Sequence, residues 1–142
     1  MSEPMEDSVI FSADSVNLSG LKVLVVDDDP DSRDLVAFLL KEYGMEVIVV
    51  ASALEVLKTI ESTQPDILLC DIGMPDMDGY MLINQIRSLS PEQGGQIPAI
   101  ALTAYAGESN QQQALKAGFQ WHLAKPVEPM DVIAVIVELT KK

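Results

Sequence analysis

Leu-Lys-Val-Leu-Val-Val-Asp-Asp-Asp-Pro, residues 21–30, is the stretch that decides the fold of this chain. Five of its first six residues are aliphatic and three of these are Val, which predicts a buried strand. The apolar run stops at three aspartates, so the strand ends in a charged loop. Asp29 followed by Pro30 is typical of a helix cap and first turn, and the helix that they begin is expected to end at Gly44.

Four more units of a strand followed by a helix are predicted along the chain. The strands are expected at residues 46–51, 67–70, 99–102 and 119–124. The helices after them are expected to begin at Ser52 with Glu55, at Asp78, near Glu108 and near Pro129. The strands are continuous apolar runs rather than alternating ones, which indicates a parallel sheet covered on both faces. The predicted fold class is therefore α/β, with five strands alternating with five helices.

The chain of 142 residues has the size of one ordinary domain. Residues 1–20 contain four acidic residues and neither Lys nor Arg, so we expect a flexible acidic leader there and a single domain over residues 21–142. The stretch 91–95 is expected to be a polar loop. No separate DNA-binding output domain is expected.

Charge and cysteine content exclude several classes of function. Asp and Glu outnumber Lys and Arg by 22 to 9, and a net charge of -13 repels nucleic acids and anionic membrane surfaces. No segment has the pattern of a signal peptide or a membrane span. Cys70 is the single cysteine, so it cannot form an internal disulfide and fits a reducing compartment. We expect a cytoplasmic protein.

Chemically reactive side chains stand where the predicted strands end. Asp27 and Asp28 follow the first strand, Asp71 the third, Thr103 the fourth and Lys125 the fifth. Parallel strands place their carboxyl ends at one edge of a sheet, where ligands of such folds bind. Three crowded carboxylates resist joint ionisation unless a cation shares the site. An all-oxygen set without His or thiolate favours Mg²⁺, with Mn²⁺ as the alternative.

Four segments carry a resemblance to a known family. They are Val-Val-Asp-Asp-Asp at 25–29, Asp-Ile-Gly-Met-Pro-Asp-Met-Asp-Gly at 71–79, Leu-Thr-Ala at 102–104 and Lys-Pro at 125–126. Together and in this order, over residues 21 to about 140, they resemble the receiver domain of bacterial response regulators. The resemblance implies a flavodoxin-like (βα)5 fold with strand order 2-1-3-4-5. It leaves open whether the chain is a stand-alone regulator or a receiver taken from a hybrid histidine kinase.

The resemblance also implies a phosphoryl-transfer chemistry. Asp71 would accept a phosphoryl group from a histidine kinase or a histidine phosphotransfer protein. Asp27, Asp28 and Asp71, with the backbone carbonyl of Gly73, would coordinate the Mg²⁺ ion. Lys125 would contact the phosphoryl oxygens. Such a domain catalyses its own phosphorylation and dephosphorylation, and it is not a turnover enzyme for small substrates.

Signal output is expected to follow from a conformational switch. Thr103 would turn toward the phosphoryl group and reshape a partner-binding surface, in a monomer or in a dimer that forms on phosphorylation. His122 stands three residues before the Lys, where the family often has Tyr or Phe as a second switch residue. Gly73 and Tyr105 occupy positions that tune dephosphorylation in the family. The two residues do not predict the lifetime of the phosphorylated state.

Two alternatives stay open on the sequence alone. A small phosphatase of the haloacid-dehalogenase type also combines an Asp nucleophile with Thr, Lys and Mg²⁺. Its D-x-D-x-T signature would require Thr or a similar residue at Asp31, and no cap domain fits. A pseudo-receiver would use the same fold only for docking, and the complete set of pocket residues argues against this reading.

Overall fold

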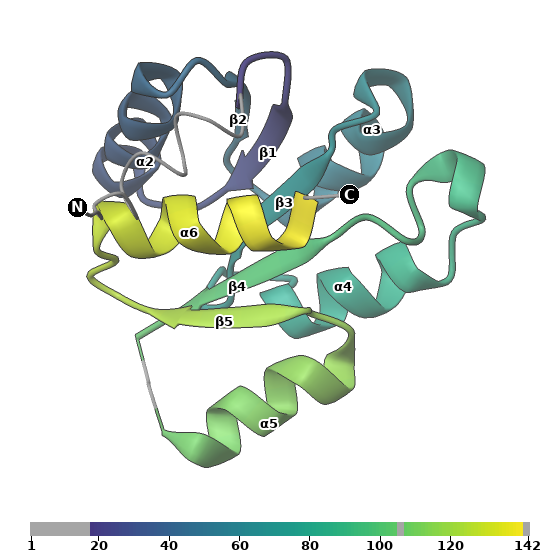
Figure 1. Ribbon diagram of the computed structural model, residues 1–142. Helices are drawn as coiled ribbons and strands as arrows, with labels where there is room; N and C mark the ends of the chain where they lie inside the picture. The colour runs from purple at the N-terminus through teal and green to yellow at the C-terminus, as the bar shows by residue number, and fades with distance from the viewer. Residues whose placement is uncertain (1–17, 105–106, 141–142) are drawn as a thin grey trace.

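The computed structural model describes residues 18–104 and 107–140, and these form one central sheet between two layers of helices (Figure 1). The strands are β1 (Lys22–Val26), β2 (Glu46–Val50), β3 (Ile67–Asp71), β4 (Ala99–Thr103) and β5 (Trp121–Ala124). The helices are α2 (Pro30–Glu42), α3 (Ala53–Thr63), α4 (Gly79–Arg87), α5 (Glu108–Ala117) and α6 (Pro129–Thr140). A short 3-10 helix, η2 (Pro91–Gln93), precedes β4.

All neighbouring strands are parallel, and their order is β2-β1-β3-β4-β5, which confirms the predicted flavodoxin-like topology. The register aligns the carboxyl ends of the central strands. Val26 of β1 lies opposite Cys70, Asp71 lies opposite Leu102, and Thr103 lies opposite Ala124. The residues that follow β1, β3 and β5 are therefore brought to one edge of the sheet.

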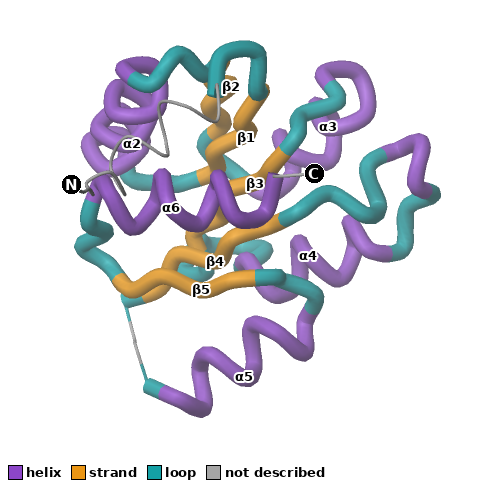
Figure 2. The backbone as a smooth tube through the Cα atoms, viewed as in Figure 1, coloured by secondary structure: helices purple, strands orange, loops and turns teal. Residues whose placement is uncertain are grey.

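Two apolar cores lie on the two faces of the sheet. Helices α2 and α6 cover one face, and α3, α4 and α5 cover the other (Figures 1 and 2). Every residue of β3 and β4 is buried, whereas β2 and β5 are partly exposed because each has a neighbouring strand on one side only. The prediction of strands buried on both faces thus holds best at the centre of the sheet.

The predicted helix caps are present. The side chain of Asp29 accepts a hydrogen bond from the Asp31 amide, and those of Ser52 and Asp78 accept from the amides of Glu55 and Met81. Each cap satisfies an amide at a helix start, where no backbone acceptor is available. These short-range signals located the first turns of α2, α3 and α4.

Several boundaries differ from the sequence prediction by one or two residues, and two of the differences have a clear local cause. The stretch expected as a polar loop at 91–95 contains η2, because Pro91 starts a turn in which Gly94 donates to the Pro91 carbonyl. The fifth strand begins at Trp121 and not at Phe119, since Gly118 ends α5 and the buried Phe119 packs into the core. Among the described residues, no helix is long and apolar enough to cross a membrane.

Candidate functional site

Three carboxylates converge at the edge where the central strands end. Asp27 follows β1 directly and is buried, Asp28 is exposed, and Asp71 is the last residue of β3 with 6% of its surface exposed. One oxygen from each lies within 4.8 Å of the others. The predicted metal ligands that carry side chains are therefore brought together, although Asp71 is far from the aspartate pair in sequence.

Lys125 brings a positive charge into this group. Its Nζ lies 3.1 Å from Oδ1 of Asp71 and 3.4 Å from Oδ2 of Asp27. The peptide bond between Lys125 and Pro126 is cis. This one ammonium group contacts two of the three carboxylates, so the cluster keeps an excess of negative charge.

The electrostatics of the site follow from burial and from this ion pair. Burial raises the pKa of Asp71, while the hydrogen bond and charge of Lys125 lower it and the charge of Asp27 raises it, with a net upward direction. Burial lowers the pKa of Lys125, but its interactions with Asp71 and Asp27 outweigh this effect and the pKa is raised. An ionised Asp71 is therefore costly here until more positive charge arrives. The oxygen-only donor set fits a hard divalent cation such as Mg²⁺.

Backbone groups hold two of the carboxylates in place. The Asp29 amide donates to Oδ1 of Asp27 at 2.9 Å, and the Gly73 amide donates to Oδ1 of Asp71 at 3.3 Å. Arg33 Nη1 donates to the backbone carbonyl of Asp27 at 2.9 Å. Arg33 is not predictable from the sequence, because no motif marks a residue that acts on the main chain one turn into a helix.

A cavity of about 300 Å³ opens above these groups. Its walls come from the loops after β1, β3, β4 and β5, and its lining residues are Asp28, Asp29, Asp71, Ile72, Gly73, Thr103, Ala104 and Lys125. Thr103 ends β4 and is 5% exposed. The cavity has room for a small anion beside Asp71, with Thr103 and Lys125 in its walls.

Of the second switch residue and the two tuning residues, the structure describes His122 and Gly73. His122 is half-buried on β5 and lines a separate hollow with Gln111, Leu115, Gln120 and Trp121. It is not among the residues that line the acidic cavity. Tyr105 lies outside the described residues. Gly73 is exposed, and a side chain added there would meet nothing within 4 Å.

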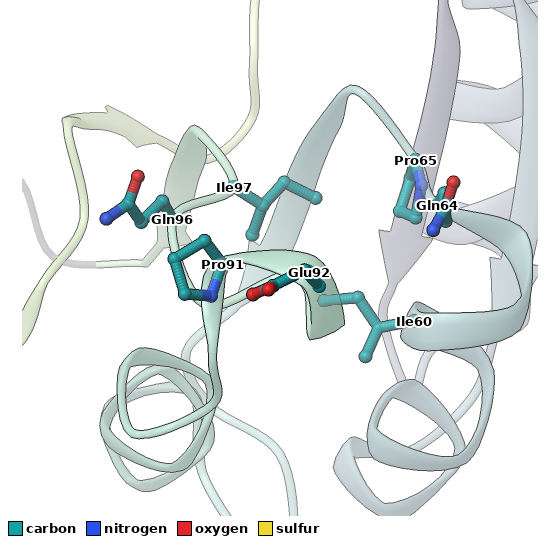
Figure 3. Close-up of a pocket in the computed structure, with 8 residues that line it drawn as sticks. Ile60, Gln64, Pro65, Pro91, Glu92, Gln96 and Ile97 are labelled. Atoms are coloured by element: carbon teal, nitrogen blue, oxygen red, sulfur yellow. The ribbon is translucent and has the colours of Figure 1, made fainter.

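A larger hollow of about 370 Å³ lies at the opposite edge of the sheet, before β3 and β4 begin (Figure 3). Ile60 and Ile97 form part of its floor, and Glu92 is the one acidic residue in its lining. Among the described residues, no cation lines it. Size alone would favour this hollow over the acidic cavity, but the charged groups that can do chemistry gather at the other edge.

Comparison with known proteins agrees with the geometry of the acidic edge. Residues 23–137 match the family model of the response regulator receiver domain. The chain belongs to this family. Receiver domains are modules of two-component signalling, and this one has the flavodoxin-like sheet order together with a cluster of three aspartates where the strands end.

Three relatives illustrate the similarity. An uncharacterized 14.6 kDa protein of Leptolyngbya boryana is 46% identical over 119 residues, which cover 84% of this chain and 89% of that protein. The sensor protein GacS of Pseudomonas syringae pv. syringae is 32% identical over 84% of this chain, and the match spans 13% of GacS. The receiver domain of the sensor histidine kinase PA1611 from Pseudomonas aeruginosa is 29% identical in sequence, with a TM-score of 0.78. The match covers 87% of this chain and 100% of that one. That structure has a magnesium ion coordinated in the active site cleft.

Proposed function

We propose that this receiver domain accepts a phosphoryl group on Asp71 and transmits the event by binding other proteins. The observation that carries the proposal is the contact between Asp71 and Lys125 inside a cluster that also holds Asp27 and Asp28. Phosphoryl transfer to an aspartate requires a nucleophilic carboxylate, a cation beside it and further carboxylates that can bind a metal ion.

In the proposed transfer, a carboxylate oxygen of Asp71 attacks the phosphorus of a phosphohistidine on the donor protein. A new O–P bond forms as the P–N bond breaks, and the imidazole leaves with the bonding electron pair. Lys125, already 3.1 Å from Asp71, would neutralise an oxygen of the transferred group. The Gly73 amide, which donates to Oδ1 of Asp71, would keep the carboxylate oriented.

Asp27, Asp28, Asp71 and the backbone carbonyl of Gly73 would hold Mg²⁺, with Mn²⁺ as the substitute. When bound, the ion would balance the negative charge that Lys125 leaves uncompensated and polarise a phosphoryl oxygen. The hydrogen bond from the Asp29 amide fixes Asp27 for this task, and Arg33 supports the same loop through its contact with the Asp27 carbonyl.

The proposed output begins at Thr103, which lines the cavity from the end of β4. Its hydroxyl would bond to the phosphoryl group, and the loop after β4 would follow. His122 on β5 is proposed as the second switch residue, and Gly73 and Tyr105 as the residues that control access of water. The domain would act as a self-catalysing phosphoacceptor and not as a turnover enzyme.

The phosphodonor is proposed to be a histidine kinase or a histidine phosphotransfer protein, and α2 offers it a surface. Leu35 and Phe38 are 69% and 64% exposed and lie one turn apart on this helix. The helix begins beside Asp29, which lines the acidic cavity. A donor helix packed on Leu35 and Phe38 would bring its histidine toward Asp71. The buried thiol of Cys70 fits a cytoplasmic setting for this exchange.

The test uses a small phosphodonor in place of the kinase. The protein is mixed with Mg²⁺ and acetyl phosphate, and its intact mass is recorded with and without EDTA beside Asp71→Asn and Asp66→Asn. We expect one added phosphoryl group that needs the metal, disappears in Asp71→Asn and persists in Asp66→Asn, whose carboxylate lies at the opposite edge of the sheet. Absence of the adduct in folded protein, with several donors tried, would favour a docking module that works without phosphorylation.

A further inference from the structure

An apolar groove, separate from the acidic cavity, is lined in part by the loop that follows β3. It has a volume of about 350 Å³, and it lies between the start of α3 and the loop that leads into α4. These two helices pack next to each other on the same face of the sheet (Figure 1). The lining residues are Ser52, Ala53, Leu54, Pro75, Asp76, Met77 and Met81.

The groove presents large apolar side chains to solvent. Leu54 is 56% exposed and Met81 is 49% exposed, and they face the groove from α3 and α4 respectively. Met77 also lines the groove, and it is partly buried against the core. Exposed apolar side chains gathered in one hollow are typical of a binding surface, and unbranched methionines adapt their shape to a partner.

The charge around the groove selects the partner. Within the part of the chain that the structure describes, Asp76 is the single charged residue in the lining, and it is exposed. Glu55 and Asp78, adjacent in sequence to lining residues, are also acidic, whereas Lys58 lies one turn farther along α3. The charge of Asp76 in the lining and the net charge of -13 disfavour binding of a second copy of this chain or of the acidic residues 1–20. A basic partner is favoured instead.

We propose that this groove binds an amphipathic helix of a partner protein, one that inserts apolar side chains between Leu54 and Met81 and sets Lys or Arg against Asp76. Helices that bind in grooves place apolar residues at positions i, i+3, i+4 and i+7, and flanking charges give specificity. The surface uses none of the side chains assigned to phosphoryl transfer. Part of its lining comes from the loop that follows β3, whose last residue is Asp71, so a partner bound there contacts the loop that leads away from the phosphorylation site.

The test follows methionine methyl resonances in the full chain. The probe is a synthetic helix of Leu and Lys, about four turns long, with Leu at i, i+3, i+4 and i+7. Its counterpart carries Glu in place of every Lys. We expect the basic probe to shift the methyl signals of Met77 and Met81 and to leave that of Met130 on α6 in place, and we expect the acidic probe to have no effect.

Variants separate the groove from general attraction to an acidic protein. Leu54→Ser combined with Met81→Gln should weaken binding at least about fivefold, because both apolar contacts are lost. Asp76→Asn should weaken it about twofold, with the difference vanishing at high salt. Asn is chosen because Asp76 has a φ of 69°, a left-handed conformation that Asn also adopts. Leu115→Ser on α5, a matched exposed leucine, should leave binding unchanged.

Three outcomes would overturn the proposal. They are equal affinity of the basic probe for the wild type and for the Leu54 and Met81 double variant, shifts at Met130 as large as those at Met81, and no binding at millimolar probe. None of them depends on Asp71, and each can be obtained with an unphosphorylated protein. A failure here therefore leaves the phosphoacceptor proposal standing.

Discussion

Arg87 and Lys125 are two half-buried cations at opposite edges of the same sheet, and their partners differ in kind. Arg87 donates to the Gly118 carbonyl from Nε at 3.0 Å and from Nη2 at 2.7 Å, to the Gly95 carbonyl at 2.9 Å and to the Gln120 side chain at 3.1 Å. These acceptors are neutral, and burial lowers the pKa of Arg87. Lys125 faces two carboxylates, and its pKa is raised.

The two edges of the sheet therefore differ in what their polar groups contribute to the stability of the fold. At the edge where the strands begin, polar groups tie loops together; Lys22, for example, donates to the Asp66 side chain and to the Thr63 carbonyl. At the edge where the strands end, carboxylates face one another with too little positive charge. The first arrangement stabilises the fold, and the second costs stability that a bound cation would restore.

The largest effect is expected from a methyl group added at the tightly packed edge. A Cβ at Gly95 would lie 2.0 Å from the Leu89 carbonyl oxygen, so the backbone must move. We expect Gly95→Ala to destabilise the fold by about 3 kcal/mol or more, measured by urea unfolding. Gly73→Ala at the open edge meets nothing within 4 Å and should change stability by less than about 0.5 kcal/mol. Equal losses of stability in the two variants would mean that the two edges of the sheet do not differ in packing at these glycines.

Arg87→Met is expected to have the next largest effect. It removes the donor that satisfies Gly118, Gly95 and Gln120 while keeping an apolar stem of similar length, and it should lower the free energy of unfolding by about 2–3 kcal/mol. Phosphoryl uptake from acetyl phosphate should persist in the folded variant. Loss of uptake at unchanged stability would assign Arg87 to the functional edge. The exposed Lys58→Met serves as the control for loss of charge.

Asp28→Asn is expected to act on metal binding rather than on the fold. The exposed carboxylate is one of the three that converge, and its loss should weaken Mg²⁺ binding about tenfold or more in isothermal titration calorimetry. Asp66→Asn removes an acidic group at the other edge and should leave the affinity unchanged. Equal weakening in both variants would mean that Mg²⁺ responds to net charge and not to the site.

The smallest effect concerns the cost of an ionised Asp71 without metal. The pKa of Asp71 is raised in the folded state, so its contribution to stability is present below the unfolded pKa and is lost as pH rises through the folded pKa. Asp71→Asn should therefore be more stable than the wild type in EDTA at neutral pH, by on the order of 1 kcal/mol or less. Lys125 keeps Asp27 as a partner in the variant.

The same reasoning gives the pH dependence of that gain. The advantage of Asp71→Asn should shrink as the pH is lowered toward 4, because the wild-type carboxyl becomes neutral as well. Thermal unfolding in EDTA across this range is the measurement. An advantage that grows in acid would mean that the folded-state pKa of Asp71 is lowered and not raised.

Much of the fold was readable from the sequence because its signals are local. The apolar runs at 21–26, 67–70 and 99–102 marked the central strands, and Asp29, Ser52 and Asp78 marked helix starts, since a cap acts within three residues of itself. The candidate site was readable for a related reason. Once the strands are parallel, residues that end them must share one edge.

What the sequence by itself determined, then, is a parallel α/β fold with Asp27, Asp28, Asp71, Thr103 and Lys125 at one edge of its sheet. Only the tertiary structure decided that Arg87 ties the loop before β4 to the loop before β5, that His122 lines a different hollow from Asp71, and that Leu54 and Met81 face solvent across a groove. The physical reason is the sequence separation over which the two kinds of interaction act. Capping and strand formation depend on neighbours in the chain, whereas burial, pKa and hydrogen-bond partners of a side chain depend on which distant segments pack around it.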